Sequence, residues 1–496
     1  MISFPVFPVN GFRRFWFGRR SQPGPGQRPD LSTLAQNEAR LPQFVRSCPV
    51  AMKYLRLLGD LDWANFPERP TNRAWPGPQP HPRAPFVAAY LVKLNEGHTY
   101  MSDLRAYLVE HPALVWLLGF KLKVDPTTPS GFEVEASVPN RKQLGRVLRE
   151  LNNQALQFLL DSSVQLLGQQ LPLEFPFGRQ IALDTKHILA WVKENNPKAY
   201  VKESDRLNKQ RQPAGDPDCK LGCKKRANDR PDEATHSTPT TQASHEPAAA
   251  AAKKKKPTNF SDLDIYYWGY ASGIVATKVP GYGEFVLAEL TQPFNCADVS
   301  YFFPLLADTE RRLGFKPRYG AFDAAFDAWY VFDYFAENGG FAAVPFTGKG
   351  GEDWQFDDAG LPHCQAGLPM PFKSTHMNHR GLIPQRQGRY ACPLLFPEPT
   401  GQACPLDHHN WSKGGCLTTM GISVGARLRY LLDRDHPDYQ WLYNQRTATE
   451  RVNSQAKEIG IERPKLRNQQ AITNQNTLIY VLINLRAYHR LRRRDN

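Results

Sequence analysis

The sequence predicts an α/β fold: a mixed sheet with flanking helices, preceded by a helical segment and interrupted by an insertion rich in cysteine and histidine. Three observations predict it. Between residues 175 and 346, short apolar runs with strand character alternate with amphipathic helical stretches. Residues 31–170 have apolar positions at helical spacing, whereas residues 347–435 are rich in Gly, Pro, His and Cys with weak periodicity. Alternating strands and helices build a sheet covered by helices.

The charge balance indicates a polyanionic partner. The 496 residues include 62 Lys and Arg against 48 Asp and Glu, a net charge of +14, and nucleic acid is the usual partner of such an excess. An anionic membrane surface is the alternative. No apolar run approaches the ~18 residues of a transmembrane helix, and the basic N-terminus lacks the apolar segment of a secretory signal. We therefore expect a cytoplasmic protein with no membrane partner and with reduced cysteines.

Two segments precede the predicted sheet. Residues 1–30 are basic and rich in Pro and Gly, and we expect a disordered tail that either contacts DNA phosphates or is solvated. Residues 31–170 are expected to form a helical N-terminal DNA-binding domain. In it, Met101–Leu118 has helical spacing, with Ser102 as N-cap and Pro112 as a break, and Asn140–Leu167 reads as one long helix with a basic start. The alternative is a helical bundle that only packs on the rest.

The predicted core occupies residues 175–346 and 436–496. Its expected elements are strands at Gln180–Asp184, Ser272–Val279 and Glu284–Leu290, a helix at Asp298–Leu313, a strand at Pro317–Phe322, a helix at Ala328–Asn338, and a strand at Gly340–Phe346. A helix at Tyr443–Lys457 follows the 347–435 insertion, and Gln469–Arg494 forms a last helix with a basic end. This order is that of a ribonuclease-H-like fold. Residues 205–262, polar and Pro- and Lys-rich, are expected to be a flexible insertion.

The helix Tyr443–Lys457 has an unusual face. Without Pro or Gly, and at about 100° per residue, it places Tyr443, Arg446, Glu450 and Lys457 within an arc of roughly 60°. An aromatic hydroxyl, a guanidinium, a carboxylate and an ammonium do not make a core face. They indicate either a solvated surface, with an Arg446–Glu450 pair at i, i+4, or a site for a polyanion and a metal.

Two aspartates upstream complete a candidate catalytic triad. Asp184 and Asp323 each close an apolar run, and Glu450 lies on a helix that can pack on the same sheet. Three clustered carboxylates need cations to stay ionised. Mg²⁺, or Mn²⁺, suits such oxygen ligands and phosphate substrates, and two ions about 3.5–4 Å apart would support in-line phosphoryl transfer. Asp327 and Asp333 compete with Asp323, which is preferred because it ends the strand.

The spacing Y-x-x-R-x-x-x-E-x-x-x-x-x-x-K resembles the Tyr-Arg-Glu-Lys signature of one group of bacterial insertion-sequence transposases, which have an Asp-Asp-Glu triad. I-A-L-D-T-K is similar to their first catalytic strand, A-F-D-A-A-F-D-A-W-Y with G-F-A-A-V-P-F to the second aspartate region, and R-T-A-T-E-R-V-N-S-Q-A-K to the glutamate helix. The resemblance covers about residues 180–470. After the second aspartate, Ala324-Ala325-Phe326 departs modestly from the family pattern.

The resemblance implies a function. Asp184, Asp323 and Glu450 would bind Mg²⁺ or Mn²⁺, and Tyr443, Arg446 and Lys457 would contact the DNA. The implied reaction is nicking at the ends of the element, followed by strand transfer through the freed 3′-hydroxyl. The implied partner is double-stranded DNA, both element ends and target, bound by a homodimer, in a nucleoid-associated bacterial protein. The alternatives are an inactive transposon-derived DNA-binding protein and a nuclease of the same fold that does not join strands.

The 347–435 insertion carries candidate zinc ligands. Four cysteines, Cys364, Cys392, Cys404 and Cys416, share it with His363, His376, His379, His408 and His409. In a reducing compartment, such clustering indicates a structural zinc ion that replaces a missing hydrophobic core. The spacings are long and contain no C-x-x-C pair, so ordinary reduced cysteines in a loop-rich insertion are the alternative.

Overall fold

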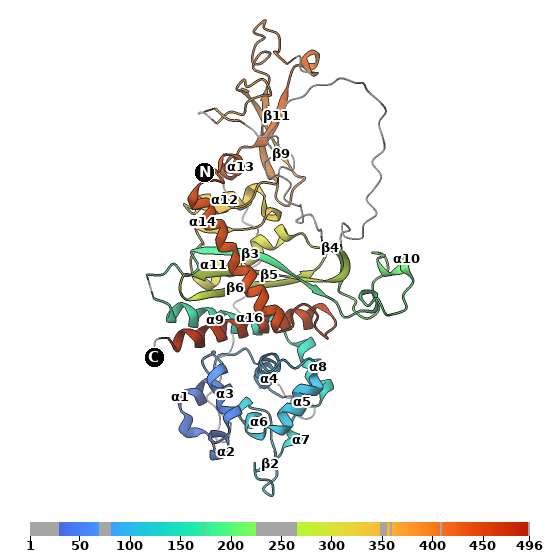
Figure 1. Cartoon of the computed structure of the whole chain (residues 1–496), viewed down its shortest axis with the longest axis vertical. Coiled ribbons are helices and arrows are strands. Elements are labelled where there is room, and N and C mark those ends of the chain that lie inside the picture. Colours follow the sequence, from blue (N-terminus) through green and yellow to red (C-terminus); the bar gives the residue numbers. More distant parts are fainter. Residues whose placement is uncertain are drawn as a thin grey trace, which may run out of the picture.

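The computed structural model describes residues 29–68, 81–172, 174–224, 265–347, 355–357, 360–406 and 409–494. N-terminal helices, a central sheet and a small outer sheet follow one another along the long axis (Figure 1). Nearly all of the predicted tail, most of the predicted flexible insertion, and His408 lie outside the described residues.

The described chain contains both α-helices and β-strands. Its α-helices are α1 (Leu31–Gln36), α2 (Gln43–Arg46), α3 (Pro49–Leu58), α4 (Ala84–Asn95), α5 (Met101–Glu110), α6 (Pro112–Leu118), α7 (Val134–Ser137), α8 (Arg141–Glu150), α9 (Asn153–Gln170), α10 (Glu203–Arg206), α11 (Phe302–Leu313), α12 (Trp329–Glu337), α13 (Val424–Leu431), α14 (Pro437–Tyr443), α15 (Thr447–Glu458) and α16 (Gln469–Arg492). Its strands are β1 (Lys123–Val124), β2 (Phe132–Glu133), β3 (Gln180–Leu189), β4 (Lys220–Lys224), β5 (Ile265–Val279), β6 (Gly283–Pro293), β7 (Tyr319–Ala321), β8 (Phe341–Ala343), β9 (Phe372–Asn378), β10 (Gln385–Ala391) and β11 (Leu417–Gly421). Short 3₁₀ helices include η4 (Asp298–Tyr301), η5 (Ala324–Phe326) and η7 (Asn444–Arg446).

The central sheet is mixed and six-stranded, in the order β4-β5-β3-β7-β8, with β6 also paired to β5. The long strand β5 is antiparallel to β3 along one edge, and along its other edge it pairs first with β4 and then with β6. β7 is parallel to β3, and β8 is parallel to β7. The parallel pairs follow from the helical crossovers α11 and α12, because parallel strands cannot be joined by a tight turn.

Helices cover both faces of this sheet. Strand side chains alternate between the faces, so Tyr270 and Ile274 of β5 enter the core with α9, α15 and α16, whereas Ala271 and Val275 enter the core with α11 and α12. Strands buried on both sides explain the nearly continuous apolar runs in β5 and β6.

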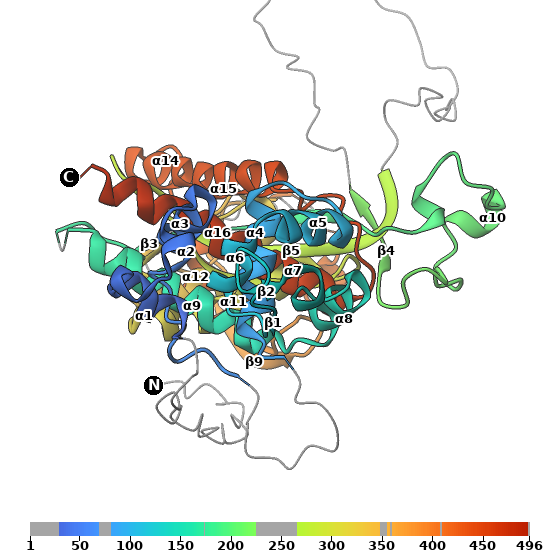
Figure 2. The same cartoon turned by 90° about the horizontal axis from the view of Figure 1, so that it is seen from below.

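The N-terminal helices do not have a separate core. Residues of α1 to α9 form one continuous cluster with α16 and one face of the sheet, and Figure 2 shows these helices stacked over α16. Within this contact, Asn474 Nδ2 donates to the carbonyl oxygens of Leu148 (2.7 Å) and Leu151 (2.8 Å). Asn484 exchanges both hydrogen bonds with the backbone of Val286 on β6. Buried amides thus tie α16 to both of its neighbours.

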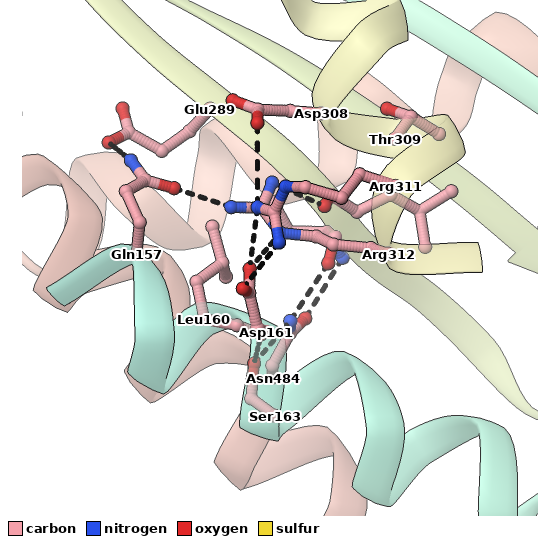
Figure 3. A network of polar contacts seen from close by, with 12 residues as sticks. Gln157, Leu160, Asp161, Ser163, Glu289, Asp308, Thr309, Arg311, Arg312 and Asn484 are labelled. Atoms are coloured by element: carbon pink, nitrogen blue, oxygen red, sulfur yellow. Dashed lines mark hydrogen bonds and ion pairs between the residues drawn. The ribbon is translucent and has the colours of Figure 1, made fainter. Parts of the chain in front are cut away.

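A second polar network joins α9 to α11 and β6 (Figure 3). The Asp161 carboxylate accepts hydrogen bonds from Arg311 and Arg312, and Arg312 also donates to Gln157 Oε1 (2.6 Å). Gln157 Nε2 in turn donates to Glu289 Oε1 (3.0 Å). Burial raises the pKa of Glu289 to about 7, and the hydrogen bond from Thr477 partly offsets it. This carboxyl group is embedded in the contact between the helices and the sheet.

Several predicted boundaries change in the N-terminal helices. Pro112 does break Met101–Leu118, since it starts α6, but Ser102 lies inside α5, and the Asp103 carboxylate accepts from the Tyr100 amide instead. The predicted single helix Asn140–Leu167 is two helices, α8 and α9. The break falls before α9 because Asn152 accepts from the Gln154 amide as its N-cap.

In the core, one predicted strand was too short and one predicted flexible segment began too early. β3 continues five residues beyond Asp184, so this aspartate lies within the strand rather than at its end. The start of the predicted flexible segment 205–262 is ordered: β4 pairs with the first five residues of β5, and Cys219 beside it is buried. Polar composition concealed an edge strand whose pairing partner lies more than forty residues later.

The 347–435 insertion contains a three-stranded antiparallel sheet, in the order β11-β10-β9, that its weak periodicity did not predict. Its own core consists of Met370, Tyr390 and Met420 with partly buried neighbours. No residue of β9 is buried, and its partly buried positions are the polar Ser374, His376 and Asn378. The strand therefore lacks the apolar and polar alternation that marks a half-buried strand in a sequence.

Across the described residues, no helix has the length and apolar character needed to cross a membrane. α16 has 24 residues, but asparagine, glutamine and arginine interrupt its apolar positions.

Candidate active site

Asp184 and Asp323 lie beside each other on the central sheet. β3 and β7 run parallel, and Ala182 lies opposite Ala321. Asp184 and Asp323 each follow two residues later, so the two aspartates lie level with each other. Neighbouring strands are about 4.8 Å apart, and residues two positions on share a face. The sequence prediction that these carboxylates meet is consistent with this register, although only Asp323 follows the end of its strand.

The two carboxyl groups interact in a largely buried setting. Burial, and next the charge of Asp323, raise the pKa of Asp184 to about 6. Burial also raises the pKa of Asp323, while the hydrogen bond from the Ala325 amide (2.9 Å) acts against the rise. The positive charge of Arg446 lowers both pKa values. A cation placed between these groups would favour their ionised forms.

The predicted helix Tyr443–Lys457 is interrupted. Tyr443 ends α14, Arg446 lies in η7, and α15 carries Glu450 and Lys457. The first three side chains still adjoin: Arg446 Nη2 lies 2.7 Å from Glu450 Oε1, and its guanidinium carbon lies 5.8 Å from the Tyr443 ring centroid. Helical geometry therefore predicted correctly that these three side chains are neighbours, but the prediction of one continuous helix was wrong.

Lys457 lies at the far end of α15, away from that group. Its Nζ is 3.9 Å from Glu462 Oε2, and Lys186 Nζ is 2.6 Å from Glu462 Oε1. Among the described residues, the exposed Lys457 forms only this long ion pair, which is therefore weak. Its ammonium group remains accessible to another anion.

The sequence interpretation missed Asn453, which contacts Asp184 directly. Asn453 Nδ2 donates to Asp184 Oδ2 (3.0 Å), and its own Oδ1 is buried and has no hydrogen-bond partner among the residues that the structure describes. Asn453 lies one helical turn after Glu450, so the spacing could have indicated it. An unpaired buried oxygen is costly, and beside two carboxyl groups it is suited to a cation or to water.

Asp298 was also missed as a member of this region. Its Oδ1 accepts from Thr185 Oγ1 (2.7 Å), and its charge raises the pKa of both Asp184 and Asp323. It starts η4, far from either aspartate in sequence, and no local motif distinguishes it from a helix-capping residue.

The competitors of Asp323 have other roles. Asp327 holds Arg429 of α13 through two short contacts, at 2.6 Å to Nε and 2.7 Å to Nη2. The buried Asp333 accepts from the Gly425 amide. Both carboxylates therefore attach α13 to the sheet domain, which supports the choice of Asp323.

Within the described ranges, no three His, Cys, Asp or Glu side chains form a group that could hold a metal ion. Glu450 is paired with Arg446 rather than with the aspartates. The chemistry of Asp184, Asp323 and the Asn453 oxygen nevertheless suits a hard divalent cation. A site with Glu450 as third ligand requires that side chain to leave Arg446.

In the insertion, three of the four predicted zinc ligands interact. Ala391 pairs with Leu417 across β10 and β11, so the next residues outward, Cys392 and Cys416, face each other. Burial, then the neighbouring Cys392, raise the pKa of Cys416 to about 12, and Cys364 adds to the rise. A bound zinc ion would instead lower the pKa of these cysteines, because it binds their thiolate form. No interaction links Cys404 to them in the part of the chain described, and zinc binding stays a prediction.

Comparison with models of protein families, with curated proteins and with solved structures finds no match. The geometry of the site therefore carries the functional argument.

Proposed function

We propose that this chain is a DNA transposase of the Asp-Asp-Glu type, which cuts at the ends of an insertion sequence and joins them to target DNA. The observation that carries the proposal is the pairing of Asp184 and Asp323 on the sheet face next to Arg446. A strand order with β5 antiparallel to β3 and β6, and β7 and β8 parallel to β3, is the order expected of a ribonuclease-H-like core. It supports the same assignment.

Asp184, Asp323 and Glu450 are proposed to hold Mg²⁺ or Mn²⁺. When bound, such ions supply an activated water or 3′-hydroxyl and stabilise the leaving oxygen of the phosphodiester. Asn453 orients Asp184 through its amide and offers its free oxygen to the same space. Asp184 lies within β3, and Asp323 follows the end of β7, which is paired with β3, so the sheet limits how far apart the two carboxylates can lie.

Arg446 links DNA binding to the third carboxylate. Its guanidinium holds Glu450 in the structure, but arginine binds phosphate in the same two-pronged manner as carboxylate. A DNA phosphate at Arg446 would therefore release Glu450 toward the aspartates. Tyr443 supports Arg446 from its ring face, and Lys457 offers a further phosphate contact along α15. Two such chains would act as a dimer on two element ends.

A cleavage assay tests the proposal. With DNA carrying the flanking ends of the element and Mg²⁺ or Mn²⁺, the parent chain is expected to nick the ends and transfer them to target DNA. Asp184→Ala should reduce cleavage by about a thousandfold, or about 4 kcal/mol, because it removes a cation ligand. The matched control is Asp308→Ala, which lies on α11 at the other face of the sheet.

The products distinguish the alternatives. Cleavage without strand transfer would identify a nuclease of the same fold. Specific binding of the ends without any cleavage would identify an inactive DNA-binding protein. A parent chain that neither binds nor cuts these ends, or an Asp184→Ala variant as active as the parent, would overturn the proposal.

A further inference from the structure

A second feature lies beyond the end of β3, where Trp191 borders a pocket of about 640 Å³. The pocket is formed by residues 189–197, which continue β3, and by residues 463–467, which follow α15. Its apolar lining includes Leu189, Ala190, Val192 and Pro464. Trp191 itself is 41% exposed, which is high for so large an apolar side chain.

The rim of this pocket is cationic. Arg467 and Lys465 lie over the Trp191 ring, with 4.9 and 5.5 Å from their charged groups to its centroid. Lys193 and Arg463 also line the pocket. In the described part of the chain, no ion pair joins Lys193, Lys465 or Arg467 to a carboxylate. These charges are thus available to an anion from outside.

The pocket lies further along the strand that carries Asp184. On β3, Asp184 and Lys186 share a face because they are two residues apart. The segment after α15 returns to this strand, since the Leu189 amide donates to the Glu462 carbonyl (2.8 Å) and Lys186 pairs with the Glu462 side chain. Five residues of strand from Asp184 to Leu189 span about 17 Å, or roughly five nucleotides of B-form spacing at 3.4 Å each.

An apolar lining with an exposed tryptophan and several cationic side chains suits one ligand chemistry. A free inorganic anion makes no use of the apolar lining, and an acidic protein segment offers carboxylates to the cations but no flat ring to Trp191. A nucleotide fits both parts, because its base can pack against Trp191 while its phosphates meet the rim. A fully paired duplex presents its bases to each other, so the base must be unpaired.

We infer that the Trp191 pocket is a DNA-binding subsite for an unpaired nucleotide of the strand that runs from the catalytic aspartates along β3. The inference rests on the proposed function for the path of the DNA, and on the pocket itself for the chemistry. In this subsite Trp191 contacts the base. The flanking phosphates are contacted by Lys193, Arg463, Lys465 and Arg467.

Binding measurements without divalent metal separate this subsite from catalysis. Fluorescence anisotropy would compare a blunt 20-base-pair duplex with the same duplex carrying a ten-nucleotide oligothymidine extension. Trp191→Ala is expected to weaken binding of the extended duplex by roughly 5- to 150-fold, the range for loss of one base–aromatic stack. Binding of the blunt duplex should change little, and Trp191→Phe, which keeps a ring, should retain most of the preference.

The chain offers a matched control in Phe315, which is 42% exposed and lines another pocket, before β7 and thus at the opposite end of the sheet from Asp323. Phe315→Ala should leave both affinities unchanged. The double variant Lys465→Gln/Arg467→Gln should reduce the slope of log K against log salt by about 1.4, at about 0.7 per single-strand phosphate contact.

Equal effects of Trp191→Ala and Phe315→Ala on the extended duplex, or equal loss of both DNAs in Trp191→Ala, would overturn the inference. Melting curves would show that the variants are folded. If Asp184→Ala abolishes metal-dependent cleavage while Trp191→Ala binds normally, the subsite fails and the transposase proposal stands. If Trp191→Ala loses the extended duplex but the parent never cleaves, the proposed function fails and the subsite stands.

Discussion

The central sheet with α16 and the small sheet β9–β11 are stabilised in different ways. α16 is buried along most of its length, and even its asparagines are enclosed and hydrogen bonded. The small sheet buries Met370, Tyr390 and Met420 and leaves β9 without a buried residue. The first region is stabilised by apolar area and by buried hydrogen bonds such as those of Asn474 and Asn484. The second has little of either, which is the condition under which a metal ion or a bound partner contributes most.

The largest expected effect is a loss of stability on truncating the core of α16. Leu482→Ala should reduce the free energy of unfolding by about 3–4 kcal/mol, because the residue is fully buried and the site cannot collapse between α9 and the sheet. Chemical denaturation would measure it. Met420→Ala in the small sheet should leave this midpoint nearly unchanged and increase amide exchange only in β9–β11. A shift of the whole transition by Met420→Ala would show that the two regions unfold together.

A smaller effect is expected from pH, and only in the central region. In the folded state, the pKa of Glu289 is raised from 4.5 to about 7. Between pH 4.5 and pH 7, the folded protein therefore keeps a proton that the unfolded chain has released. The resulting stabilisation is complete below pH 4.5 and is lost as the pH rises through 7, by up to about 3 kcal/mol. Glu289→Gln should flatten this dependence and be more stable than the parent at pH 8.

Unfolding free energies between pH 4.5 and 8 would check the Glu289 prediction. Glu398→Gln is the control, because Glu398 is exposed in the insertion and should not change the profile. A parent whose stability is level over this range would contradict the assigned shift.

The smallest effect on overall stability is expected from metal removal. If zinc links the thiols of the insertion, the purified chain should contain about one equivalent of zinc. Chelation should then speed amide exchange in β9–β11 without moving the main melting transition. Cys392→Ser should lose the metal, and Cys296→Ser, a half-buried cysteine of the central region, should retain it. Equal zinc content in both variants would refute a site at Cys392.

The sequence predicted the central region better than the insertion for a physical reason. Strand and helix periods are visible where one face is buried, so β6, α11 and α12 were predicted close to their positions and the second half of β5 was found, although its first seven residues were missed. In β9 the partly buried positions are polar, so the sequence carries no such pattern. The order of elements also placed Asp184 beside Asp323. It did not indicate Asn453 or Asp298, whose roles depend on which side chains meet across the fold.

The same limit applies to the N-terminal helices. Their amphipathic faces predicted helices but not the partner, and Asn474 on α16 gives no local sign that it binds carbonyl groups of Leu148 and Leu151. DNA contact by these helices stays a prediction, since their apolar surfaces are used in packing against α16.

α16 packs against helices that are synthesised long before it, and this order has a consequence during translation. Asn474 is 326 positions from Leu148, and at roughly 5–20 residues per second the ribosome needs about 16–65 s to reach it. For that time the apolar faces of the early helices have no α16 to cover them. The nascent chain must therefore remain unaggregated until its final helix emerges, and molecular chaperones are the natural means of keeping it so.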